Sequence, residues 1–269
     1  MAKRLDVSHV TQRFVLPNNE TMTVLYDVSF SLHDGEVLGL IGESGCGKST
    51  LAKMIMGVYG APTEGDIVCN GCSLTERRHW PKTILQDLHL IFQDGASALN
   101  PAMTVRDIIG EAIMLRSGTS SFRRARIDEL LEQVGLEKRY GDAVPSELSG
   151  GQRQRVAIAR CLAMEPKVIL ADEPIAALDV SMQAQILNLL MDIQEERRFS
   201  LLFIAHDLAV VRHICQRVLV MKEGAIVEEG PTERIFLEPQ HAYTKELLYS
   251  ILRPDPKYER EKARERKRI

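Results

Sequence analysis

Residues 42–50, which read GESGCGKST, restrict the fold of this chain more than any other segment. They follow the wholly apolar run at residues 37–41 and precede a stretch to residue 57 with helical spacing. This order of strand, loop and helix fits the pattern G-x-x-x-x-G-K-[ST], in which glycines let backbone N–H groups turn toward phosphate oxygens. The positive end of the helix dipole adds to this attraction. The sequence therefore predicts a binding site for the phosphates of a nucleotide.

The side chains of this loop have separate predicted roles. Lys48 is expected to pair with the β- and γ-phosphates, Ser49 to offer its hydroxyl to Mg²⁺, and Thr50 to bind another phosphate oxygen. The loop residues predicted to bind the nucleotide are Gly42, Glu43, Ser44, Gly45, Cys46, Gly47, Lys48, Ser49 and Thr50.

A second apolar run, residues 168–171, ends in Asp172 and Glu173. Such a run predicts a buried strand, and the two carboxylates would follow it at the edge of the sheet. Asp172 is expected to hold Mg²⁺ through its water shell. Glu173 is expected to polarise the water that attacks the γ-phosphate. The sequence therefore predicts hydrolysis of ATP or GTP at this site.

The remaining patterns predict an α/β fold. Short β-rich segments in the first 35 residues indicate a small antiparallel sheet, and apolar runs at 168–171, 201–205 and 218–221 alternate with helical stretches, as a parallel sheet requires. The charged stretch 101–147 leans helical and indicates an inserted helical lobe. We expect a domain over residues 3–253, with a helical subdomain at approximately 96–160 and a charged C-terminal tail at 254–269.

Composition excludes several classes of function. The 45% hydrophobic and 26% charged residues are typical of a soluble globular protein, and the net charge of −3 gives no general attraction to nucleic acid. No apolar run approaches the roughly 20 residues of a membrane-spanning helix. The basic segment 257–268 is expected to be a solvated tail, with contact to anionic lipid headgroups as the alternative. The five cysteines are expected to be reduced, and the lone CxxC of Cys69 and Cys72 is not expected to bind zinc.

Residues 148–152 read LSGGQ and precede another helical stretch. This segment resembles the signature of ABC ATPases, and further motifs of that family lie in the family's order along the chain. Gln93 resembles the Q-loop, Asp179 the D-loop and His206 the H-loop, while Phe14 matches the aromatic position that stacks on adenine. The resemblance implies a P-loop NTPase fold of the ABC nucleotide-binding type, with a RecA-like core, an antiparallel β subdomain and an inserted α-helical subdomain.

The resemblance also implies a dimer in which two subunits pack head to tail. Each signature then covers the γ-phosphate that the partner's glycine loop holds; its residues here are Ser149, Gly150, Gly151 and Gln152. The implied catalytic residues are Glu173, His206 and Lys48. Gln93 joins the ATP-binding set, and the implied Mg²⁺ ligands are Ser49, Gln93 and Asp172. ATP and Mg²⁺ are the expected cofactors.

The resemblance is closest to the ATPases of the peptide and nickel importer branch and covers residues 5 to about 252. It includes the C-terminal extension PQHAYT at 239–244, where Ala242 replaces the usual proline. Gly95 with Ala96 and Ile175 with Ala176 depart from the branch pattern, and the first pair could alter the groove that receives a membrane subunit. Some members carry a cysteine cluster for an iron–sulfur centre, but no cysteine follows Cys215 here, so we expect no cluster.

We therefore expect an ATP-hydrolysing subunit that energises an ABC importer for peptides, nickel or a related small solute. The resemblance implies three kinds of partner: a second ABC ATPase subunit, either a copy or a sister, two transmembrane permease subunits, and an extracytoplasmic solute-binding protein. The expected location is peripheral, on the cytoplasmic face of the inner membrane. One alternative is a nonmembrane ABC ATPase of repair or translation, against which the chain shows no heptad arms, second cassette or zinc pairs. The other is a regulatory nucleotide-binding module, which we would expect to have lost Lys48, Glu173 or His206.

Overall fold

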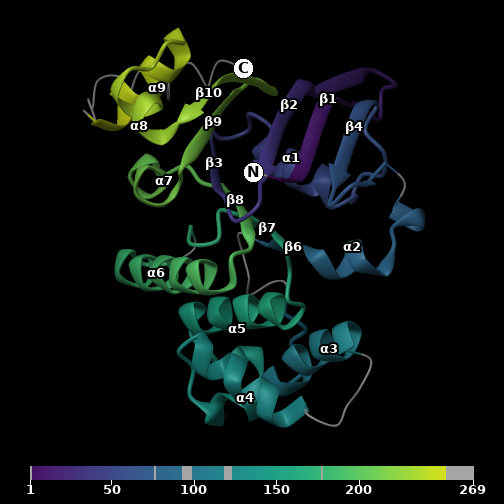
Figure 1. Cartoon of the computed structure of the whole chain (residues 1–269), viewed down its shortest axis with the longest axis vertical. Coiled ribbons are helices and arrows are strands. Elements are labelled where there is room, and N and C mark those ends of the chain that lie inside the picture. The colour runs from purple at the N-terminus through teal and green to yellow at the C-terminus, as the bar shows by residue number, and fades with distance from the viewer. Residues whose placement is uncertain (1, 76, 93–98, 118–122, 177, 253–269) are drawn as a thin grey trace.

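The computed structural model of this chain describes residues 2–75, 77–92, 99–117, 123–176 and 178–252. Figure 1 shows two sheets in the upper part of the molecule and a layer of helices at its lower end. The predicted α/β class, with one antiparallel and one largely parallel sheet, is confirmed.

The larger sheet has six strands in the order β10-β9-β3-β8-β7-β6. Neighbouring strands from β6 to β9 are parallel, and only β10 runs antiparallel to its neighbour. The carboxyl ends of β3, β7 and β8 therefore meet at one edge, where ligands bind in such sheets. The strands are β3 (Val37–Ile41), β6 (Leu88–Ile91), β7 (Val168–Asp172), β8 (Ser200–Ile204), β9 (Arg217–Lys222) and β10 (Ala225–Pro231).

Both faces of this sheet are buried, which explains why its strands are continuously apolar. On β3, Val37 and Ile41 belong to the hydrophobic cluster that includes α5 and α6, whereas Leu38 and Leu40 belong to a second cluster. The second cluster joins the sheet to α1 and to the smaller sheet, so α1 lies between the two sheets.

The smaller sheet is antiparallel and has the order β2-β1-β4-β5. The sequence predicted only its first two strands. The other two are joined by a two-residue turn at Asn70 and Gly71, both of which have positive φ, of 48° and 76°. Positive φ at both positions matches the right-handed twist of a hairpin. The strands are β1 (Lys3–Val15), β2 (Thr21–His33), β4 (Glu64–Cys69) and β5 (Cys72–Ser73).

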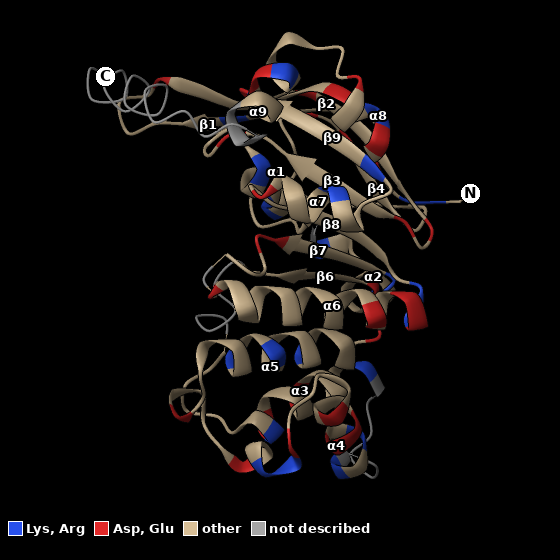
Figure 2. Ribbon diagram, turned by 90° about the vertical axis from the view of Figure 1, so that its left-hand side faces the viewer, with Lys and Arg blue, Asp and Glu red and all other residues tan. Residues whose placement is uncertain are grey.

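The lower layer consists of α3, α4 and α5, which contact one another. Apolar residues from all three helices, among them Ile109, Leu130 and Val156, are fully buried, while α4 carries both basic and acidic residues along its surface (Figure 2). The predicted limits of the domain, of the helical subdomain and of the tail stay predictions, because residues 96 and 253–269 fall outside the described part. None of the helices in the described ranges has the length and apolar character needed to cross a bilayer.

The helices have the following bounds: α1 (Lys48–Ile55), α2 (Lys82–Asp87), α3 (Val105–Ser117), α4 (Arg123–Gln133), α5 (Gly150–Ala163), α6 (Val180–Arg197), α7 (Leu208–Ile214), α8 (Thr232–Leu237) and α9 (Ala242–Leu252). Short 3₁₀ turns occupy Arg77–His79, Lys138–Asp142 and Pro145–Glu147.

Candidate functional site

The glycine loop joins β3 to α1 and packs closely against β2. Gly47 precedes the first residue of α1 and has a φ of 110°. A Cβ atom there would lie 3.1 Å from Leu25 Cδ2 and 3.2 Å from the carbonyl oxygen of Val24. The backbone angle therefore requires glycine, and the close approach leaves little room for a Cβ atom, while the N–H groups at the start of α1 remain directed at the loop.

Lys48 lies inside the loop. Its side chain is buried, and Nζ donates hydrogen bonds to the carbonyl oxygens of Gly42 and Glu43, each at 2.8 Å. Cys46 Sγ lies 3.7 Å from the same nitrogen, and burial raises the pKa of this thiol, which keeps it neutral at physiological pH. A buried ammonium among backbone groups is suited to an anion that enters the loop.

Ser49 and Asp172 connect the loop to the end of β7. The hydroxyl of Ser49 donates to Asp172 Oδ1 at 3.0 Å, and the carboxylate is buried. Burial raises the pKa of Asp172, an effect that the hydrogen bond from Ser49 opposes. A hydroxyl beside a carboxylate offers the hard oxygen ligands that Mg²⁺ prefers, and a cation would stabilise the charge that burial penalises. These two residues therefore fit the predicted metal.

Glu173 directly follows β7 and has a strained backbone. Its φ of 47° is unusual for a residue with a side chain, and its N–H donates to the carbonyl oxygen of Ile204 at 3.0 Å. Its Oε2 lies 3.5 Å from His206 Nδ1, and the carboxylate is mostly buried while the imidazole is 65% exposed. Strain of this kind is found at functional sites, where the surrounding structure maintains it. The structure thus brings Lys48, Ser49, Asp172, Glu173 and His206 to the same edge of the sheet.

The LSGGQ segment begins α5, on the opposite face of the large sheet from α1. Ser149 Oγ accepts the N–H of Gln152 at 3.3 Å, and Gln152 Oε1 accepts the N–H of Ser149 at 2.8 Å. This reciprocal capping box fixes the start of the helix. Ser149 and Gly150 are exposed, so the helix start is open to a ligand outside this chain.

Asp179 is the N-cap of α6, and its carboxylate accepts the N–H of Met182 at 2.9 Å. The start of α6 lies against the start of α5, because a Cβ atom on Gly151 would meet Met182 Cε at 1.8 Å. The segment before it contains Ile175, which departs from the branch pattern and is buried in the core.

Phe14 is half-buried near the end of β1. Its ring centroid lies 5.0 Å from that of Tyr59 in an edge-to-face arrangement, a partner that the sequence did not indicate. Gln93, the predicted Q-loop residue, and Gly95 with Ala96 lie outside the described residues. The roles predicted for all of these residues stay predictions.

The structure also places Tyr243 at the loop, which the sequence did not predict. The N–H of Glu43 donates to Tyr243 Oη at 3.0 Å, across 200 residues of sequence. Residues 239–244 were recognised only as a C-terminal extension, and a contact over this separation has no local sequence signal.

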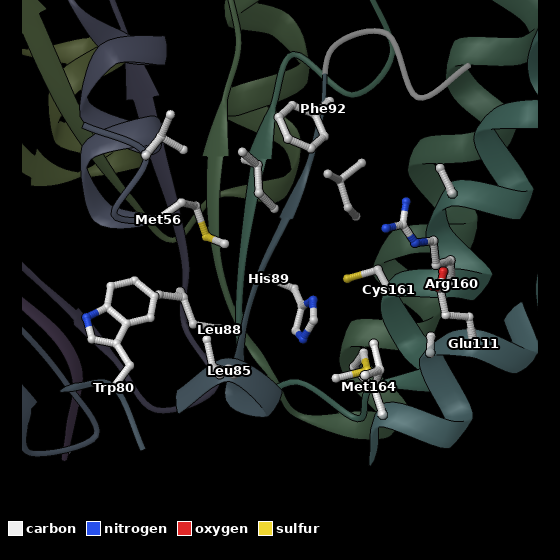
Figure 3. A pocket seen from close by; sticks show the side chains of 16 residues that line it. Met56, Trp80, Leu85, Leu88, His89, Phe92, Glu111, Arg160, Cys161 and Met164 are labelled. Atoms are coloured by element: carbon white, nitrogen blue, oxygen red, sulfur yellow. The ribbon is translucent and has the colours of Figure 1, made fainter. Parts of the chain in front are cut away.

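A separate pocket of about 470 Å³ opens between β6, α3 and α5 (Figure 3). Its lining is largely apolar and includes Trp80, Leu115, Met164 and His89. Burial lowers the pKa of His89 to about 4, and its Nε2 has no hydrogen-bond partner among the described residues. Phe92, which also lines this pocket, directly precedes the predicted Q-loop.

Comparison with known proteins identifies the family. Residues 25–176 match the model of the ABC transporter family. This chain belongs to that family. Residues 227–269 of the ABC chain also match the model described as the oligopeptide/dipeptide transporter, C-terminal region, which confirms the predicted resemblance to this branch.

Curated relatives and solved structures resemble this ABC chain over most of its length. The oligopeptide transport ATP-binding protein OppF of Bacillus subtilis is 46% identical over 98% of the chain and 87% of the relative. The dipeptide transport ATP-binding protein DppF of Haemophilus influenzae is 42% identical over 91% of the chain and 75% of the relative. The ATP-binding cassette MJ0796, solved as a post-hydrolysis dimer bound to ADP and Pi, has a TM-score of 0.74 and 32% identity over 85% of this chain and 98% of its own.

Proposed function

We propose that this ABC chain is the ATP-hydrolysing subunit of a peptide importer. The observation that carries the proposal is the meeting of the glycine loop with Asp172, Glu173 and His206 at one edge of the sheet. The match of residues 227–269 to the peptide transporter region and the names of the relatives support peptides as the transported solute.

In this proposal each side chain has one task. Lys48 stays beside the carbonyl oxygens of its own loop and directs its remaining N–H at the β- and γ-phosphates, while Phe14 stacks on the adenine. Glu173 accepts the proton of the attacking water, which it can do because the mostly buried carboxylate stands at the end of β7. His206, 3.5 Å from Glu173, contacts the γ-phosphate from the solvent side.

Ser49, Asp172 and Gln93 would hold Mg²⁺. When bound, this ion supplies positive charge that offsets the negative charge developing on the phosphate oxygens. The chain's own contribution is the hydrogen bond of 3.0 Å between Ser49 and Asp172, which holds both oxygen atoms beside the loop before ATP arrives.

Dimerisation completes the site in this proposal. The capped helix start at Ser149, Gly150, Gly151 and Gln152 is an anion site on the far side of the sheet from its own loop, so it serves the γ-phosphate of a second ABC ATPase subunit. Asp179 lies beside it at the start of α6. The dimeric state of the cassette MJ0796 supports this arrangement. The second subunit is either a copy of this chain or a sister.

The apolar pocket between β6, α3 and α5 is proposed to receive a segment of a transmembrane permease subunit. Leu115, in its lining, is 60% exposed and gives an incoming segment an apolar surface to contact. Two permease subunits and an extracytoplasmic solute-binding protein would complete the importer, and this chain would lie peripherally on the cytoplasmic face of the inner membrane.

Uptake by whole cells tests the solute. Cells that lack this chain are supplied with the wild type or with Lys48→Met, and the uptake of a labelled oligopeptide and of radioactive nickel is measured. The proposal expects the wild type, and not the variant, to restore peptide uptake. Restoration of nickel uptake alone would move the substrate to the nickel branch, and restoration of neither would contradict the importer function.

A further inference from the structure

The C-terminal helix α9 reaches the phosphate loop through Tyr243. This side chain lies in the first turn of α9 and is 5% exposed. Its Oη accepts the N–H of Glu43 at 3.0 Å. The loop is therefore held by a residue from the far end of the sequence as well as by its own strand and helix.

The hydrogen bond is placed on a peptide group that also holds Lys48. The N–H of Glu43 and the carbonyl oxygen of Gly42 belong to one planar peptide group, and the carbonyl accepts a hydrogen bond from Lys48 Nζ at 2.8 Å. A planar group that is held at both ends has a fixed orientation. Tyr243 at one end thus sets the direction of the carbonyl that positions the ammonium at the other.

Tyr243 itself is held firmly. Both oxygens of Glu228, on β10, accept backbone N–H groups just before α9, from Gln240 at 2.8 Å and from His241 at 3.0 Å. Lys222 Nζ lies 5.0 Å from the centroid of the Tyr243 ring. Burial raises the pKa of Tyr243 to about 12, so the phenol stays neutral at physiological pH. The α9 helix therefore enters the contact in one orientation and one protonation state.

We propose that Tyr243 is a positioning residue for ATP binding, which couples the C-terminal helix to the phosphate loop through the Gly42–Glu43 peptide group. This inference rests on the proposed function, because Lys48 matters only if the loop binds a nucleotide. Tyr243 does not touch the reacting atoms; it acts through the position of the lysine.

The variant Tyr243→Phe tests the inference, because it removes only the oxygen and preserves the ring. Losing the acceptor for a partly buried N–H is expected to weaken the binding of a fluorescent ATP analogue to the purified full chain about ten-fold. The KM for ATP should rise by a similar factor while kcat changes little, since Lys48 contacts the phosphates before and during the reaction.

Tyr249→Phe is the matched control. Tyr249 lies on the same helix but is 63% exposed, so its change should leave both the analogue affinity and the KM at wild-type values. Thermal unfolding of the nucleotide-free proteins reports any general loss of packing. If Tyr243→Phe lowers only the unfolding temperature and binds the analogue as the wild type does, Tyr243 is merely structural and the inference fails. If the wild type itself does not bind the analogue, the proposed function fails first.

Discussion

Two substitutions at Asp179 separate its contribution to the stability of the chain from its contribution to ATP turnover. The carboxylate caps α6 by accepting the N–H of Met182 at 2.9 Å. Asp179→Ala leaves that N–H without its side-chain acceptor, whereas Asp179→Asn keeps an acceptor of the same shape and removes only the charge. Asp179 lies beside the signature at the proposed dimer contact. We expect ATP turnover to need the charge of its carboxylate as well as the cap.

The magnitudes follow from the geometry of the cap. Replacing an N-cap aspartate by alanine costs about 1 kcal/mol of the free energy of unfolding. Asparagine caps nearly as well, and loses only the charge–dipole contribution of about 0.3 kcal/mol expected at an exposed helix start. In a protein of this size, about 1 kcal/mol lowers the unfolding temperature by roughly 2 °C.

Urea denaturation of the nucleotide-free chain, followed by circular dichroism, measures the two free energies of unfolding. ATP turnover of the same samples is measured in parallel. We expect Asp179→Ala to lose stability and turnover, and Asp179→Asn to lose turnover with nearly wild-type stability. Asp179 does not stabilise α6 as a cap if Asp179→Ala is as stable as the wild type, or if Asp179→Asn is destabilised as much as Asp179→Ala.

Two further predictions follow from burial. Burial raises the pKa of Asp172 above its ordinary value of 3.8, so the folded state binds a proton at this carboxylate more tightly than the unfolded state does. The stability of the wild type therefore falls as the pH rises from the ordinary pKa through the raised pKa of the folded state. Asp172→Asn should therefore gain stability relative to the wild type between about pH 4 and pH 7 in urea denaturation; an unchanged difference would contradict the burial cost. Cys72 is the only cysteine of the five that is not buried, so brief iodoacetamide treatment followed by mass spectrometry should find Cys72 alkylated first. Equally fast labelling of Cys46 would show that the loop thiol is more accessible than the structure has it.

Local patterns predicted the parts of the site that are continuous in sequence. The run Val37–Ile41 predicted β3, and the glycines and Lys48 that follow it predicted the loop, because a buried strand and a phosphate loop each leave a short, specific pattern. The same reasoning placed Asp172 and Glu173 at the end of a strand, where the structure has them.

Contacts between distant segments could not be predicted in this way. Tyr243 reaches Glu43 across 200 residues, and Tyr59 meets Phe14 from the segment after α1, and neither separation has a periodic signal. The strands β4 and β5 were also missed, because β4 is defined by its pairing with β1 and the two-residue β5 by its pairing with β4. Tertiary packing decides such elements more than local preference does.

In the proposed function Glu173 is the base for ATP hydrolysis between two head-to-tail subunits, and the variant Glu173→Gln probes this role. The purified variant and the wild type are incubated with ATP, and turnover and molar mass are measured by phosphate release and light scattering, alone and with candidate sister subunits. We expect the variant to lose turnover and to accumulate as an ATP-bound dimer, because glutamine cannot accept the proton of the attacking water. Hydrolysis by the variant at the wild-type rate, or the absence of an ATP-dependent dimer with every partner, would contradict it.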